Sequence, residues 1–205
     1  MKKLFTILIV VALTTTASFG QVQWGVGLGL NMASVSVSGE NVGDVDMRTG
    51  IRLGVTADIT LGRSDVLTLN TGALYSVKGL ETEDLGVLGT TSISFNYLEI
   101  PLHLSYAVSD VVSLKAGPYL GILLGSSYTV DGDDIGDYET SDVVGNSMDF
   151  GLTFGASFNV SDAISIDAGY QIGLSDLDMF PNNFLGEVEV ANSNILIGMT
   201  YSFGR

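Results

Sequence analysis

Two-residue alternation is the feature that most constrains this chain. After residue 20, apolar side chains alternate with small or polar ones in eight separate segments, and each segment has about ten residues or more. A period of two indicates β-strands with two different faces, and about ten residues suffice for a tilted strand to cross a bilayer. No stretch among them has the 18 consecutive apolar residues of a membrane-spanning helix. The eight segments are 22–32, 51–61, 67–77, 93–106, 112–124, 149–159, 164–174 and 195–203.

The connections between these segments alternate strictly in length. Three are short, at 62–65, 107–110 and 161–163. Four are long, at 33–49, 78–91, 125–147 and 175–193. Short turns at one end and long loops at the other are typical of bacterial outer-membrane barrels. We therefore predict an all-β fold, an eight-stranded antiparallel up-and-down transmembrane β-barrel, with the four long loops extracellular and both termini periplasmic.

The charged residues of the segments indicate which face meets lipid. All six fall on the face of Gly, Ser, Thr and Asn, never on the apolar face. A cation on the lipid side near the bilayer centre would cost about 2–4 kcal/mol, and an acid somewhat less. A soluble barrel or secreted sandwich is the alternative, but its surface would carry more charge than these strands offer. The six inward residues are Arg52, Asp58, Glu99, Lys115, Asp149 and Asp167.

Aromatic residues gather near the segment ends, as expected for the two interfacial girdles of a membrane barrel. We place Trp24, Tyr106, Phe158, Tyr201 and Phe203 at the periplasmic rim and Tyr75, Tyr97 and Phe150 at the outer rim. In segment 93–106 the apolar phase changes from odd to even positions. That change predicts a β-bulge near Tyr97–Leu98.

The N-terminus reads as a secretory signal peptide. Lys2 and Lys3 precede an apolar run, and Ser18 and Gly20 place small side chains before a cleavage site. We predict a cleaved signal peptide over 1–20 and the barrel domain over 21–205. Export to the outer membrane implies contact with outer-membrane lipid and, during insertion, with the barrel-assembly machinery.

Composition excludes several functions. The net charge of −15, from 8 Lys and Arg against 23 Asp and Glu, disfavours binding to nucleic acid. The chain has no Cys, which removes disulfides, thiolate catalysis and Cys-ligated zinc. We predict no cofactor and no resident metal. The glycines at 25, 27 and 29 alternate within a strand, and the helix that a nucleotide loop requires does not follow them.

The inward polar residues are the candidate site. His103, the single histidine, shares the face of Glu99 and lies near a short turn, so an ester-hydrolysing role next to lipid is disfavoured. Two interpretations of the set stay open, a gate or polar relay and a structural plug of compensated charge, and the second is favoured. We predict no catalytic residues. The set is Arg52, Asp58, Glu99, His103, Lys115, Asp149 and Asp167.

The connection at 131–139 is strongly acidic. Carboxylates suit Ca²⁺ or Mg²⁺, but no Glu occupies the twelfth position from Asp131 that a calcium loop requires. We therefore expect a solvated loop there.

Four motifs resemble a known family. Residues 97–102 (YLEIPL), 117–121 (GPYLG), 149–156 (DFGL followed by GA) and 170–176 (Tyr170 with GLSD) are similar to successive strands of the outer-membrane β-barrel domain of Bacteroidota, the PorT-like family. The chain departs from it in ending on Gly204 and Arg205 after Phe203. The resemblance implies location and architecture, and no single activity.

The leading functional prediction is a structural or interaction role through the extracellular loops, with an envelope protein as the possible partner. Passive transport of small solutes is the alternative, although open aqueous channels are typical of 16–18 strands. A lipid-modifying enzyme is a weaker third.

Overall fold

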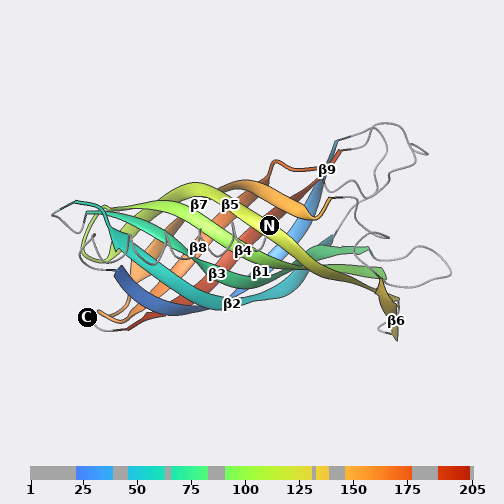
Figure 1. The fold of residues 1–205 in the computed structure, drawn as a ribbon, viewed down its shortest axis with the longest axis horizontal. Helices are drawn as coiled ribbons and strands as arrows, with labels where there is room; N and C mark the ends of the chain where they lie inside the picture. The colour runs from blue at the N-terminus through green and yellow to red at the C-terminus, as the bar shows by residue number, and fades with distance from the viewer. Residues whose placement is uncertain are drawn as a thin grey trace, which may run out of the picture.

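The computed structural model describes residues 22–38, 46–62, 66–82, 91–130, 133–138, 146–176 and 189–203. The predicted signal peptide lies outside these residues. The described chain consists of nine strands and the turns between them (Figure 1). They are β1 (Val22–Ser38), β2 (Asp46–Thr60), β3 (Leu67–Thr82), β4 (Thr91–Ala107), β5 (Val112–Val130), β6 (Asp133–Tyr138), β7 (Met148–Asn159), β8 (Ile164–Gly173) and β9 (Glu189–Ser202).

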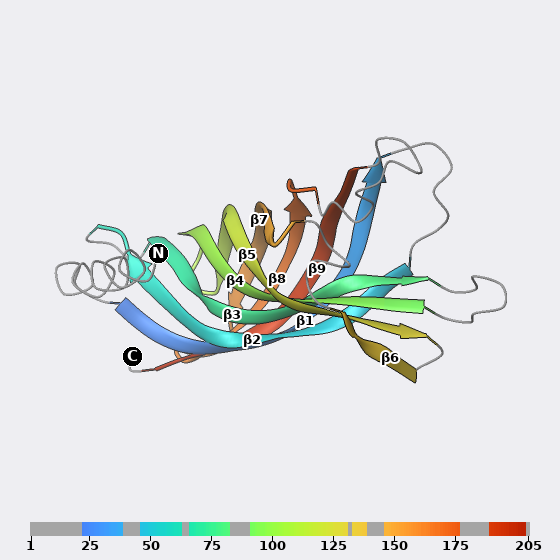
Figure 2. The same cartoon turned by 45° about the vertical axis from the view of Figure 1, so that its right-hand side comes forward.

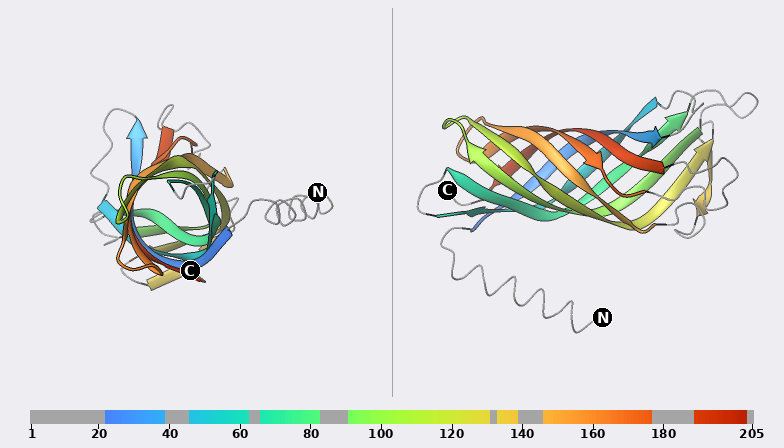
Figure 3. Two further views of the ribbon diagram at one scale, coloured as in Figure 1. Left: turned by 90° about the vertical axis from the view of Figure 1, so that its left-hand side faces the viewer. Right: turned by 90° about the horizontal axis from the view of Figure 1, so that it is seen from above.

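Eight of the strands close into one antiparallel barrel. The sheet order is β4-β3-β2-β1-β9-β8-β7-β5-β6, and additional pairing between β4 and β5 completes the ring. A view along the barrel shows the closed wall (Figure 3). Closure removes the unpaired strand edges that hydrocarbon cannot hydrate. The predicted fold is thereby confirmed.

The stagger of the strands can be followed residue by residue around the wall. A row of directly paired, outward residues leaves β1 at Val22 and returns to β1 at Met32. The offset, from 22 to 32, is ten residues for eight strands, which is consistent with the usual tilt of roughly 35–45°. The row runs through Ile59, Leu69, Leu104, Ala116, Phe154, Tyr170 and Ile195.

Two of the short turns have the same local chemistry. In Val108–Val111 and Val160–Ala163 a Val-Ser-Asp sequence ends the incoming strand. The Ser109 hydroxyl accepts from the backbone N–H groups of residues 111 and 112, and the Ser161 hydroxyl does the same for 163 and 164. Such serine turns reverse the chain with few residues. The start of β1 and the end of β9 lie at this same end, where Phe203 N–H donates to the Trp24 carbonyl.

At the other end the strands run further than the alternation predicted. β1, β3 and β5 continue to residues 38, 82 and 130, so the long connections are shorter than expected. Part of the acidic segment is also strand, because β6 pairs with the extended end of β5, contrary to the expected loop. Figure 2 shows β1 and β9 diverging there from β5 and β6.

The predicted bulge at Tyr97–Leu98 was wrong in its strand. The register shift lies between Asn96 and Tyr97, whose partners are Gly125 and Leu123, so the extra residue is Leu124 of β5. β4 therefore keeps its phase. Tyr97 is 0% exposed inside the barrel and is not part of the outer girdle. The sequence pattern predicts that the Tyr97 ring faces lipid, but in the structure this ring fills the interior of the barrel.

The outer surface of the wall is apolar. Leu28 on β1, Leu114 on β5 and Phe154 on β7 are about half exposed, as is Trp24 at the short-turn rim. This is the inversion of a soluble core that lipid contact requires. Within the described part of the chain, no helix combines the length and hydropathy needed to cross a membrane.

Candidate functional site

The predicted polar residues occupy the lumen in two groups. Arg52, Glu99 and Asp149 lie together midway along the barrel. Lys115 and Asp167 form a separate ion pair nearer the short turns. The strand stagger determines this division, because cross-strand neighbours lie at different depths. The single network expected from the sequence is therefore two networks.

Lys78 is at the centre of the middle group and was missed by the sequence analysis. Its Nζ lies 3.0 Å from Asp149 Oδ2 and 3.2 Å from Glu99 Oε2, and its side chain is 0% exposed. The same Nζ lies 4.2 Å from the centre of the Tyr119 ring and 5.5 Å from that of Tyr97. A buried ammonium is tolerated only with such compensation by carboxylates and ring faces.

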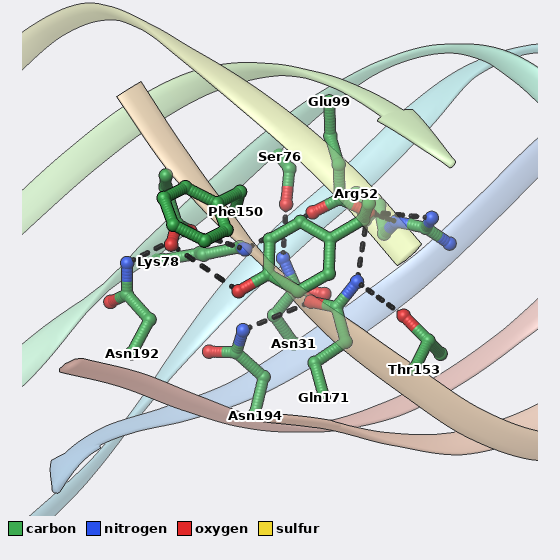
Figure 4. Close-up of polar contacts among 12 residues, drawn as sticks. Asn31, Arg52, Ser76, Lys78, Glu99, Phe150, Thr153, Gln171, Asn192 and Asn194 are labelled. Atoms are coloured by element: carbon green, nitrogen blue, oxygen red, sulfur yellow. Dashed lines mark hydrogen bonds and ion pairs between the residues drawn. The ribbon is translucent and has the colours of Figure 1, made fainter. Parts of the chain in front are cut away.

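Glu99 joins β4 to β2 and β8. Arg52 donates to Glu99 Oε1 from Nε at 3.1 Å and from Nη2 at 2.8 Å. Gln171 Nε2 donates to the same oxygen at 3.1 Å and to the Thr153 hydroxyl at 3.3 Å. Figure 4 shows these side chains converging from opposite walls. Glu99 thus connects strands on both sides of the lumen.

Asp149 accepts from four groups, one of which is the ammonium of Lys78, its ion-pair partner. Asn192 Nδ2 and the Ser175 hydroxyl each donate at 3.0 Å, and the Tyr119 hydroxyl donates at 3.3 Å. The Lys78 ammonium adds its own donation at 3.0 Å. All of these residues are at most 3% exposed. A carboxylate with so many donors is fixed in place.

Amides extend the packed layer between the strands. Asn194 donates to Gln171 Oε1 at 3.0 Å, and Asn31 donates to the Ser76 hydroxyl at 2.8 Å. We define the plug as a set of six residues that are each 0–2% exposed. They are Lys78, Glu99, Asp149, Tyr97, Tyr119 and Gln171. The plug joins β3, β4, β5, β7 and β8 across the middle of the barrel.

The second group is more open. Lys115 Nζ lies 2.7 Å from Asp167 Oδ1, and the two side chains are 21% and 28% exposed. Asp167 also accepts from Ser157 and, at 2.9 Å, from Thr200. A cavity of about 720 Å³ surrounds this pair, and we call it the chamber. Its lining runs from Arg52 and Thr153 beside the plug to Asp110 and Asp162 in the short turns.

Asp58 and His103 also line the chamber. Asn70 Nδ2 donates to Asp58 Oδ1 at 2.6 Å. His103 is 8% exposed, and its Nε2 has no hydrogen-bond partner among the described residues. In the register between β4 and β5, Lys115 is paired with Ser105, one inward position beyond His103.

One signal in the sequence could have found Lys78. Along β3 the inward positions are even, at Asn70, Leu74 and Ser76, and 78 continues that parity. The strand was predicted to end at Val77, so Lys78 was assigned to a loop. A charged residue just beyond the end of a predicted strand should therefore be included among the candidate lumen residues when its position continues the inward parity of that strand.

The side chains of 131–139 are not among those that the structure describes, so the expectation that its carboxylates are solvated and hold no cation stays a prediction. Among the residues that the structure does describe, no three His, Cys, Asp or Glu side chains are grouped as metal ligands.

A family model agrees with this architecture. The outer membrane protein beta-barrel domain family matches residues 15–179. The chain belongs to that family. The barrel is accordingly a bacterial outer-membrane protein, with its apolar wall in lipid. Among curated proteins, none matches the sequence.

The chain is similar to several solved structures at low sequence identity. Neisserial surface protein A (NspA) has a TM-score of 0.53 at 15% identity, covering 88% of this chain and 97% of that one. Ail, the attachment invasion locus protein of Yersinia pestis, has a TM-score of 0.45 at 17% identity, with 89% and 99% covered. OprG from Pseudomonas aeruginosa has a TM-score of 0.40 at 14% identity, with 90% and 95% covered.

Proposed function

We propose that this protein is a non-conducting outer-membrane barrel that acts through its long connections, in a structural or interaction role. The plug carries the proposal. Lys78, Glu99 and Asp149 are each 0% exposed and are bonded to opposite walls, so ions have no hydrated path between them. A barrel of eight strands has room only for such side chains.

Charge gives the long connections a chemical character. The connections 33–49, 78–91, 125–147 and 175–193 hold three, three, six and four acidic residues, which is 16 of the 23 in the chain. Their only basic residues are Arg48 and Lys78, and Lys78 is inside the barrel. Opposite charge accelerates and orients protein association. An envelope protein with a basic surface is therefore the partner that this end favours.

Three further expectations belong to the same proposal. The termini face the periplasm, because short turns and termini share one end and short turns are periplasmic in this class. The barrel-assembly machinery inserts the chain. Within the family, the PorT-like branch of Bacteroidota is supported by the YLEIPL and GPYLG motifs at 97–102 and 117–121. No catalytic role is proposed.

Planar-bilayer recording tests the closed lumen. We expect the refolded wild-type barrel to give no resolved conductance steps. A matched variant with Lys78→Ala, Glu99→Ala and Asp149→Ala should conduct, because the three charged side chains of the plug are truncated and Arg52 is left as a cation without its carboxylate partner. Steady conductance from the wild type, equal to that of the variant, would overturn the proposal in favour of passive transport.

Chemical cross-linking in intact cells tests the interaction role. A variant with the acids of 131–139 changed to Asn or Gln keeps the eight barrel strands and loses five negative charges. We expect the wild-type chain to give a specific cross-linked envelope protein that this variant loses. Identical cross-links from both chains would contradict recognition through charge.

A further inference from the structure

The chamber is built unlike the plug, although both lie in one lumen. It holds about 720 Å³, a volume within the range of small-molecule sites, and it reaches the short turns through Asp110 and Asp162. Arg52 and Thr153 lie at its inner end, beside the plug. The chamber is thus closed on one side by buried charge and bounded on the other by turns.

Three buried polar atoms in its lining have no hydrogen-bond partner among the described residues. They are Gln23 Nε2, Asn70 Oδ1 and His103 Nε2. They belong to one cross-strand row, in which Gln23 is paired with Asp58, Asp58 with Asn70, and Asn70 with His103. Buried polar atoms in folded proteins are almost always satisfied by protein, water or ligand. This row therefore faces something that hydrogen-bonds to it.

The three atoms without a partner differ in whether they donate or accept hydrogen bonds. An amide nitrogen donates, an amide oxygen accepts, and an imidazole nitrogen does one or the other. A hydroxyl group both donates and accepts, so a molecule with several hydroxyl groups can hydrogen-bond to all three atoms. Thr56, Thr68 and Ser105 add further hydroxyls to the lining.

The two cations of the chamber, Arg52 and Lys115, are already paired with carboxylates of the wall. Arg52 lies 2.8 Å from Glu99, and Lys115 lies 2.7 Å from Asp167. An anionic ligand would have to displace a carboxylate from one of these pairs, and it would also face Asp58, Asp110 and Asp162 in the same lining. The row of Gln23, Asn70 and His103 needs both donors and acceptors, which a neutral hydroxylated ligand supplies without adding charge. The described lining has no Phe, Trp or Tyr, so stacking adds nothing and the affinity is expected to be weak.

We propose that the chamber is a binding site for small, neutral, hydroxyl-rich solutes, from glycerol to a monosaccharide. They occupy the space between the plug and the short turns and hydrogen-bond to the row Gln23, Asn70 and His103. The site is independent of conduction, because the plug closes its inner end.

Saturation-transfer NMR on the refolded barrel tests this, in a zwitterionic detergent that carries no sugar. Glycerol and glucose are the hydroxylated probes, and tetramethylammonium and methanesulfonate, a cation and an anion that both carry observable protons, are the charged ones. The matched variant is Gly27→Leu. A Cβ at Gly27 would meet Thr56, Leu74 and Thr200 at 3.5, 3.7 and 3.8 Å, which is ordinary contact, so a larger side chain grows into the chamber.

We expect transfer to glucose and glycerol in the wild type and at least a tenfold loss in Gly27→Leu, with little transfer to the charged probes. Heat-modifiable gel mobility reports folding, and Thr68→Met replaces Gly27→Leu if that variant does not fold. No transfer to either polyol, equal transfer in the filled variant, or preference for tetramethylammonium or methanesulfonate would each overturn the proposal. Conductance is measured on the same samples, so failure of this site is distinct from failure of the closed lumen.

Discussion

The plug and the chamber are made from the same kind of strand and differ in how fully their polar groups are enclosed. Lys78 and its two carboxylates are 0% exposed, whereas Lys115 and Asp167 are 21% and 28% exposed. Large rings, Tyr97 and Tyr119, fill the plug, and small Ser, Thr and Gly side chains surround the chamber. Side-chain size on the inward face thus decides where an eight-stranded lumen is closed and where it stays hollow.

The largest effect is expected from Lys78→Met in the plug, which is to be compared with the same substitution at Lys115 in the chamber. Asp149 then loses its cation while it stays buried, and breaking a buried pair in this way costs about 3–5 kcal/mol. We expect that loss in the free energy of unfolding, measured by reversible urea unfolding in lipid vesicles. Lys78→Met combined with Asp149→Asn should recover most of it, and additive losses in the double variant would contradict the coupling.

A smaller loss is expected from filling Gly121, an inward glycine beside the plug. A Cβ at Gly121 would lie 3.2 Å from the Tyr97 ring and 3.3 Å from Asp149 Cβ. Gly121→Ala should therefore reduce stability by about 1–3 kcal/mol through overpacking. Urea unfolding measures it, and an unchanged midpoint would show that the plug yields more easily than its contacts indicate.

Lys115→Met should cost less than Lys78→Met, because water in the chamber screens the Asp167 carboxylate that is left behind. We expect about 1–2 kcal/mol, between the values for exposed and buried pairs. Gel mobility and urea unfolding report it beside the Lys78 variant. If Lys115→Met were the more damaging of the two, the ranking of the halves by enclosure would be wrong.

The smallest effect, of opposite sign, is expected for Gly27→Ala in the chamber. The new methyl meets its neighbours at 3.5 Å or more, and the unfolded chain loses freedom. We expect a gain of about 0.4–1 kcal/mol where the backbone accepts Ala. A loss as large as that of Gly121→Ala would contradict the existence of free space at Gly27.

Much of the architecture could be predicted from the sequence, and the reason is physical. Alternation of side chains assigned Arg52, Glu99 and Asp149 to the inward face, because the period of a strand leaves one choice of face once lipid is excluded. Turn length set the order and direction of the strands.

The alternation of residues could not predict two features of the lumen, the pairing of its charges and the facing of its aromatic rings. Which cation meets which acid depends on the ten-residue stagger of the barrel, and that is a property of all eight strands together. Tyr97 shows the other limit. An aromatic ring packs equally well against lipid and inside a crowded lumen, so the alternation pattern alone predicted the wrong face for it. Lys78 was missed for a different reason, because it lies beyond the predicted end of β3.

Cysteine accessibility in this cysteine-free chain tests the division of the lumen most directly. Single variants Thr56→Cys in the chamber and Ser76→Cys in the layer around the plug are refolded together with an exposed control, Val160→Cys, and treated with a small hydrophilic thiol reagent. We predict that Thr56→Cys reacts at a rate near that of the control and that Ser76→Cys reacts at least a hundredfold more slowly. Equal rates at 56 and 76 would contradict a closed plug above an open chamber.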